Sequence, residues 1–86
     1  MTAKNKRTDV RIVVAISGWV FMGEYKSCGD HVTLENASCV RVWGTSAGLG
    51  EIALHGPTER TVLDPAGFVE IPMNSVVATI KCTYCR

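Results

Sequence analysis

The residues best suited to chemistry lie together in the middle of the chain, in the stretch "RVWGTSAGLGE" (41–51). Arg41 and Trp43 stand two residues apart, so on a strand they share one face. Thr45 and Ser46 open a run of small residues before a predicted helix, where unpaired N–H groups favour an anion. Because a nucleotide binds to an aromatic plane, a guanidinium and such donors, these four residues predict a site for a nucleotide-type ligand. In the alternative, Trp43 covers the core and Arg41 is a solvated strand residue.

Patterns typical of catalysis are absent from the sequence. It has no H-E-x-x-H pattern, and its glycine-rich stretch lacks the lysine of a phosphate-binding Walker loop. His31, at a predicted strand start, and His55, at a predicted helix end, are expected at the surface. We therefore predict a binding protein rather than an enzyme, with no catalytic residue and no cofactor.

Four cysteines raise the alternative of a metal site. Cys82 and Cys85 form a C-x-x-C pair, but Cys28 and Cys39 are spaced more widely than the thiolates of a usual zinc knuckle. Disulfides are not expected in the cytosol. We expect thiols, some of them packed as small apolar residues, and no bound metal.

Length and charge restrict the class of protein. The 86 residues, 47% of them apolar, fit one small domain, expected at 9–86 after a flexible basic tail at 1–8. The formal net charge of +1 is too small for a general nucleic-acid binder. No apolar run reaches the roughly 18 residues that cross a membrane, and the apolar start is interpreted as strands rather than a signal peptide. We expect a cytosolic protein with no membrane partner.

Hydrophobic alternation predicts three strands in the first half of the chain. These segments are 9–17, 19–27 and 31–43. Gly23 indicates a bend in the second, and the blurred alternation at 36–38 indicates a bulge in the third. In the first segment, one face would carry Val10, Ile12, Val14 and Ile16. In the second, the aromatic residues of one face would serve as core or subunit contact: Trp19, Phe21 and Tyr25.

The second half begins with a change to helical periodicity. Apolar and small residues recur with helical spacing at Leu49, Ile52, Ala53 and Gly56. Thr45 or Ser46 is expected to cap the start of this short helix, and Gly56-Pro57 to end it. A loop is expected over 57–67, with a short strand at 61–63 as an alternative within it, then strands at 68–72 and 75–82. The predicted fold is mainly β: a small, strongly bent five-stranded barrel with one short helix between strands three and four.

Two parts of this pattern resemble the motifs of Sm-like proteins, which are small SH3-type barrels. In 23–42 the first motif is matched by Gly23, Asp30, Val32, Leu34 and Ala37. In 69–80 the second is matched by Ile71, Asn74, Val76, Val77 and Ile80. The chain departs from the family where its members read RNA. His31 stands in place of an asparagine, and Pro72 and Met73 in place of an arginine and a glycine. The resemblance thus implies the architecture without the usual RNA contacts, and adds His31 to the candidate ligand-binding residues.

A second, closer resemblance is to an uncharacterised family of small phage and prophage proteins. Over 37–56 the matching positions are Ala37, Trp43, Leu49, Glu51, Ile52, Ala53 and Gly56. The stretch 39–42 departs from it, because relatives often carry a basic residue and aromatic residues before the tryptophan. This resemblance implies a protein of a mobile element that acts in the cytosol of a bacterial host.

Together these observations predict a phage counter-defence protein that sequesters a nucleotide-type immune signal, such as a cyclic oligonucleotide or an ADP-ribose derivative. Two alternatives stay open: an Sm-like protein that binds single-stranded RNA or DNA, and a protein–protein inhibitor of a host defence enzyme. Because the last two predicted strands are short and apolar, we also expect a homo-oligomer. Its contact would be formed by Val76, Ala78 and Ile80 or the residues that alternate with them.

Overall fold

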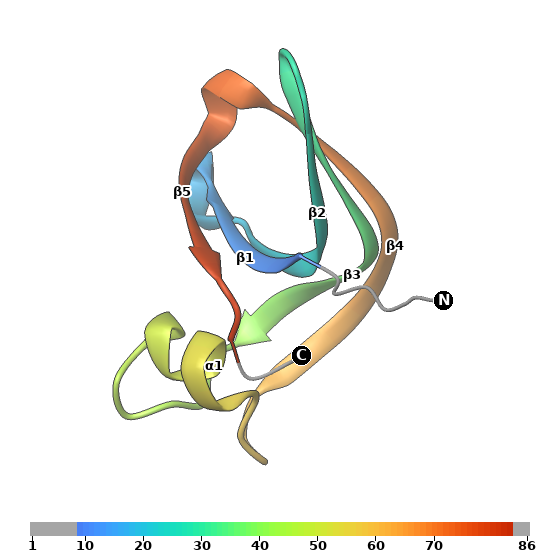
Figure 1. Ribbon diagram of the computed structural model, residues 1–86. Helices are drawn as coiled ribbons and strands as arrows, with labels where there is room; N and C mark the ends of the chain where they lie inside the picture. The colour runs from blue at the N-terminus through green and yellow to red at the C-terminus, as the bar shows by residue number, and fades with distance from the viewer. Residues whose placement is uncertain (1–8, 84–86) are drawn as a thin grey trace.

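The computed structural model describes residues 9–83 and has the expected mainly β fold (Figure 1). The strands are β1 (Val10–Ala15), β2 (Val20–Cys28), β3 (His31–Val42), β4 (Val62–Pro72) and β5 (Val76–Lys81). The helix α1 (Leu49–His55) lies between β3 and β4, as predicted, and two 3-10 turns complete the chain: η1 (Ile16–Gly18) and η2 (Met73–Ser75). The predicted tail at 1–8, and Cys85, lie outside the described residues.

All five strands belong to one antiparallel sheet in the order β4-β3-β2-β1-β5. The sheet is strongly curved, and η2 links its two edge strands, β4 and β5, directly (Figure 1). The strong bending inferred from the sequence is therefore present, while the closure of β4 onto β5 as a barrel stays a prediction.

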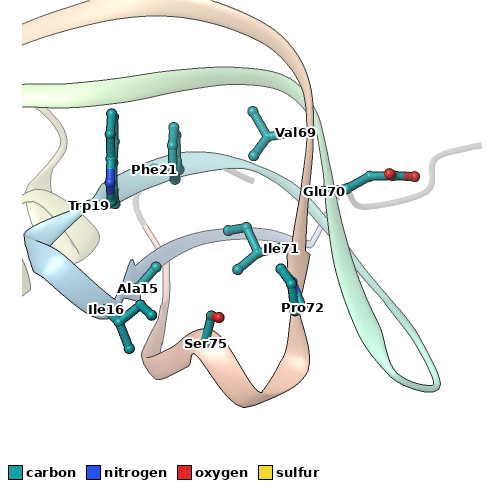
Figure 2. Close-up of a pocket in the computed structure, with 9 residues that line it drawn as sticks. All are labelled: Ala15, Ile16, Trp19, Phe21, Val69, Glu70, Ile71, Pro72 and Ser75. Carbon is teal, nitrogen blue, oxygen red and sulfur yellow. The ribbon is translucent and has the colours of Figure 1, made fainter.

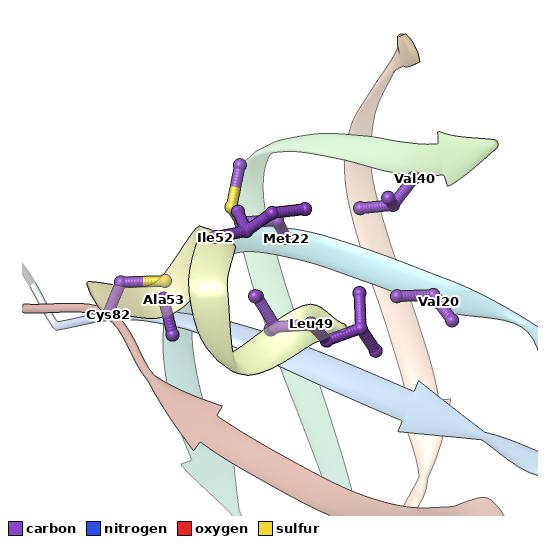
Figure 3. Close-up of a cluster of buried hydrophobic side chains, with 8 residues drawn as sticks. Val20, Met22, Val40, Leu49, Ile52, Ala53 and Cys82 are labelled. Atoms are coloured by element: carbon purple, nitrogen blue, oxygen red, sulfur yellow. The ribbon is translucent and has the colours of Figure 1, made fainter. Parts of the chain in front are cut away.

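Both faces of the sheet are buried, each by its own apolar cluster. The helix-side cluster, under α1, consists of Ile12, Val20, Met22, Val40, Leu49, Ile52, Ala53 and Cys82 (Figure 3). The inner cluster, on the other face, consists of Val13, Ala15, Leu34, Ala37 and Ile71. Since β1 contributes to both, its burial is not confined to the single face that the sequence predicted. Ile16 was wrongly placed on that face, because the chain leaves the strand at η1 and exposes 54% of this residue.

A bulge at Gly23 bends the β2–β3 hairpin, as the sequence indicated. The register shifts between Met22 and Glu24. The extra residue lies on β3, where Asn36 has no partner in the strand pairing and takes a φ of 51°. Gly23 is required here because the two strands approach closely. A Cβ at this position would lie 3.0 Å from both the Ala37 Cα and the Glu35 carbonyl oxygen.

The strand β4 is longer than expected, because residues 62–67 of the predicted loop extend it. Pro65 suggested a loop, but it lies opposite Ser38 beside a register shift. On an edge strand, a missing N–H group at such a shift interrupts the ladder little. The strand therefore runs from Val62 without a break, and Asp64 lies opposite Cys39 of β3.

The helix α1 is stabilised mainly by packing. Leu49, Ile52 and Ala53 are buried, at the spacing that the sequence predicted. Gly56 ends the helix at a φ of 89°, and its N–H group donates to the Ile52 carbonyl. The start differs from expectation, because Gly48 takes the cap position and no side chain caps it.

The segment between β3 and α1 starts with a glycine that no other residue can replace easily. Gly44 has a φ of 65°, and a Cβ here would lie 2.4 Å from the Arg60 carbonyl carbon. The turn at 57–61 is thus packed directly against the backbone that follows Trp43.

We predict that Gly44→Ala lowers the free energy of unfolding by about 2–4 kcal/mol, because it adds backbone strain to a clash with backbone atoms. Gly29→Ala is the matched control, since Gly29 also has a positive φ, of 70°, but has open space around it. It should cost only about 1–2 kcal/mol. Urea unfolding measures both values. Equal losses would contradict the close packing at Gly44.

Candidate functional site

Arg41 lies near the end of β3 on the face opposite α1, because its neighbour Val40 points into the helix-side cluster. Its Nε donates to Asp64 Oδ2 at 2.7 Å, and its Nη2 lies 3.4 Å from Asp64 Oδ1. This hydrogen-bonded ion pair raises the pKa of Arg41, so the guanidinium stays charged. The Arg41 side chain is still 63% exposed, and it can contact solvent or a ligand beside Asp64.

Trp43 follows on the same end of β3, with a fixed backbone and an open side chain. Its carbonyl accepts a hydrogen bond from Thr61 Oγ1 at 2.7 Å, and the next carbonyl, of Gly44, accepts one from Thr58 Oγ1 at 2.7 Å. The residue is 45% exposed and belongs to neither apolar cluster. Trp43 is therefore not one of the buried core residues, and both interpretations of its ring, as a ligand contact or as a cover of the core, stay predictions.

The small-residue loop before α1 already binds a carboxylate of the chain itself. The N–H groups of Ser46 and Ala47 donate to Glu51 Oε1 at 3.2 and 3.0 Å. Thr45 Oγ1 donates to the Gly48 carbonyl at 3.0 Å. An external anion at Ser46 would have to displace Glu51, so Arg41 and Trp43 are the more accessible of the four predicted residues.

His31 lies at the opposite end of β3, about 30 Å along the strand from Arg41 at the usual rise per residue. Its Nδ1 lies 2.9 Å from Asp30 Oδ1, and this hydrogen bond lowers the pKa of Asp30. The structure therefore groups Arg41, Trp43, Thr45 and Ser46 at one end of the sheet and does not bring His31 to them.

A cleft that the sequence did not reveal opens on the inner face beside Trp19. Its volume is about 320 Å³, and Ala15, Trp19, Phe21, Val69 and Ile71 are among its lining residues (Figure 2). The rings of Trp19 and Phe21 are parallel within 1°, with centroids 5.8 Å apart. Phe21 packs against the inner cluster, as expected of a core residue, but 56% of Trp19 is exposed.

The strand register relates this cleft to Arg41. Phe21 lies opposite Cys39, and the same register continued by two residues brings Trp19 level with Arg41. The pairing of β2 with β3 ends at Phe21 and Cys39, so the level of Trp19 with Arg41 is an extension of this register, whereas Trp43 follows directly after β3. The position of Trp19 relative to Arg41 could have been estimated from the sequence. Residues on the two strands are counted outward from the Gly29-Asp30 turn, with one extra residue allowed for the bulge at Gly23.

The described cysteines are dispersed: Cys28 is exposed, Cys39 is half-buried between β2 and β4, and Cys82 is buried under α1. Within residues 9–83 no three His, Cys, Asp or Glu side chains are grouped so that they could hold a metal ion. Over the same residues, no helix has the length and apolarity needed to cross a membrane.

We predict that Glu51→Ala lowers the free energy of unfolding by about 1 kcal/mol, because it removes the acceptor of two loop N–H groups, as the loss of a helix cap does. Glu51→Gln keeps an oxygen acceptor and should cost less. Glu59→Ala, in the exposed turn after the helix, is the control for the loss of one negative charge. Urea unfolding compares the three variants, and equal values for Glu51→Ala and Glu59→Ala would contradict the role of Glu51.

Comparisons with known proteins do not assign this arrangement to a family. The chain matches no protein-family model, and no curated protein matches it.

Proposed function

We propose that this protein is a non-enzymatic phage counter-defence factor, which sequesters a nucleotide-type immune signal in the cytosol of a bacterial host. The biological setting rests on the resemblance of 37–56 to small phage proteins. The ligand class rests on one observation: the exposed guanidinium of Arg41 stands two residues before the exposed Trp43, at the end of β3. Sequestration needs tight binding and no turnover, and therefore no catalytic group.

Arg41 provides the contact to a phosphate. Its ion pair with Asp64 holds the guanidinium plane in one orientation and leaves further N–H groups for phosphate oxygens. The indole of Trp43, on its fixed backbone, offers a stacking surface for a base.

Assembly into a homo-oligomer would increase the enclosure of such a ligand. The two edge strands, β4 and β5, offer backbone groups for pairing with another copy. Of the β5 residues predicted for this contact, Val76 and Ile80 pack partly against the two clusters and Ala78 is exposed. Among the alternating residues, Val77 is 64% exposed. Phe68 on β4 is 58% exposed. We therefore propose a contact between copies through these two edges, with Val77 within it.

We predict that calorimetry detects binding of at least one cyclic dinucleotide, cyclic trinucleotide or ADP-ribose derivative. Arg41→Gln should weaken it by about 10- to 100-fold, which is the usual effect of losing a hydrogen bond from a charged group. Arg60→Gln is the matched control, because it removes the same charge from an exposed turn near the site and should leave the affinity unchanged.

Absence of heat with all three ligand classes would rule out the proposed function. Strongly salt-dependent binding of single-stranded RNA or DNA instead would favour the Sm-like alternative, since several phosphates would then be contacted at once.

For the assembly, we predict a mass of more than one chain by light scattering at micromolar concentration. Val77→Lys should reduce it to a single chain, because lysine on an edge strand disfavours pairing with another edge. Leu54→Lys is the control, since Leu54 is similarly exposed, at 59%, but lies on α1. A single-chain mass for the unmodified protein would contradict the oligomer.

A further inference from the structure

The cleft beside Trp19 is almost entirely apolar. Side chains from three parts of the sheet form it: Ala15 of β1, Trp19 and Phe21 of the β2 end, and Val69 and Ile71 of β4. Glu70 also borders it, but its carboxylate points away from the other side chains in Figure 2, whereas Ser75 directs its hydroxyl among them. Because an apolar cleft opposes the burial of a charge, an occupant would be uncharged in the part that enters it.

One wall of the cleft has the geometry of an aromatic stack. The parallel rings of Trp19 and Phe21 form an ordered pair, and Trp19 still exposes more than half of its surface. Packing of Phe21 against the inner cluster holds this pair in place. A third flat ring can add to such a pair by offset stacking, which suits a planar ring better than a flexible aliphatic chain.

The charged part of the same ligand has a partner nearby. Continued by two residues beyond the Phe21–Cys39 pair, the register brings Arg41 level with Trp19. One small molecule could then place a ring in the cleft and an anionic group at the guanidinium. The arrangement separates an uncharged flat part from a negatively charged part, and a nucleotide has this division.

We propose that the cleft is the base-binding half of the site, in which an uncharged nucleobase stacks on Trp19 while its phosphate contacts Arg41. This inference rests on the proposed function, and it adds a binding position for the base of the ligand in the cleft. Trp19 thus becomes a ligand-binding residue rather than a core or subunit contact.

The first test observes Trp19 directly in the full chain. The protein has two tryptophans, so its NMR spectrum has two indole N–H signals, which Trp43→Phe assigns. We expect at least one of the four common ribonucleosides to shift the Trp19 signal, whereas ribose 5-phosphate, which lacks a base, should leave it in place. No shift with any nucleoside would overturn the inference.

The second test measures affinity by calorimetry with the nucleoside 5′-monophosphates. Trp19→Leu should weaken binding by about tenfold or more, as is usual when a stacking aromatic is lost, and Trp19→Phe should restore part of the affinity. Leu54→Ala is the control, because this large apolar side chain is similarly exposed but lies on α1, away from the edge strands, and does not line the cleft.

The outcomes separate this inference from the proposed function. Nucleotide binding that Trp19→Leu leaves unchanged would overturn the base-binding cleft and retain the function. Nucleoside shifts at Trp19 without binding of any cyclic nucleotide or ADP-ribose derivative would retain the cleft and rule out the function. If Trp19→Leu does not fold, the indole signal of the unmodified chain still decides the matter.

Discussion

The close approach of β2 and β3 at Gly23 determines much of this structure. A Cβ at Gly23 would lie only 3.0 Å from backbone atoms of β3, and at this point a bulge shifts the register of the two strands by one residue. The shift bends the long hairpin, as bulges do by increasing the local twist. It also decides which residues lie opposite each other beyond it: Phe21 pairs with Cys39, and the same register continued by two residues would bring Trp19 level with Arg41. A regular hairpin would pair these strands one residue out of step and point the two side chains to opposite faces.

The bent sheet also resolves a difficulty of size. A chain of 86 residues with one helix of seven residues cannot cover both faces of a flat sheet with helices. Here α1 buries one face, while curvature lets side chains of β1, β3 and β4 bury one another on the inner face. The inner face is filled less completely near Trp19, where a cleft remains between Trp19, Phe21 and residues 69–72 of β4. The cleft is thus a consequence of covering a sheet by bending it.

Features that depend on a few neighbouring residues could be predicted from the sequence, whereas contacts between distant segments could not. The bend at Gly23, the burial of Leu49, Ile52 and Ala53, and the end of α1 at Gly56 all follow from local periodicity and glycine positions. The length of β4 did not, because Pro65 is compatible with a strand only beside a shift on an edge. Two hydrogen-bond partners were also missed: Asp64, which pairs with Arg41, and Glu51, which binds the loop before α1. Each pair forms only because the folded chain brings a later segment back beside an earlier one. A short sequence motif does not contain this information about tertiary contacts.

These two carboxylates bear on how a ligand would be held. Asp64 offsets the charge of Arg41, and Glu51 occupies the N–H groups of Ser46 and Ala47, so the site carries little net positive potential at rest. An extended polyanion would gain little from such a surface, because its affinity depends on many unopposed cations. Stacking on the exposed rings of Trp19 and Trp43 would be unaffected by the carboxylates, so it would contribute more to binding than the phosphate contacts. For the proposed site, this balance of charge is an argument for a small ligand with flat rings and few phosphates rather than a nucleic-acid strand.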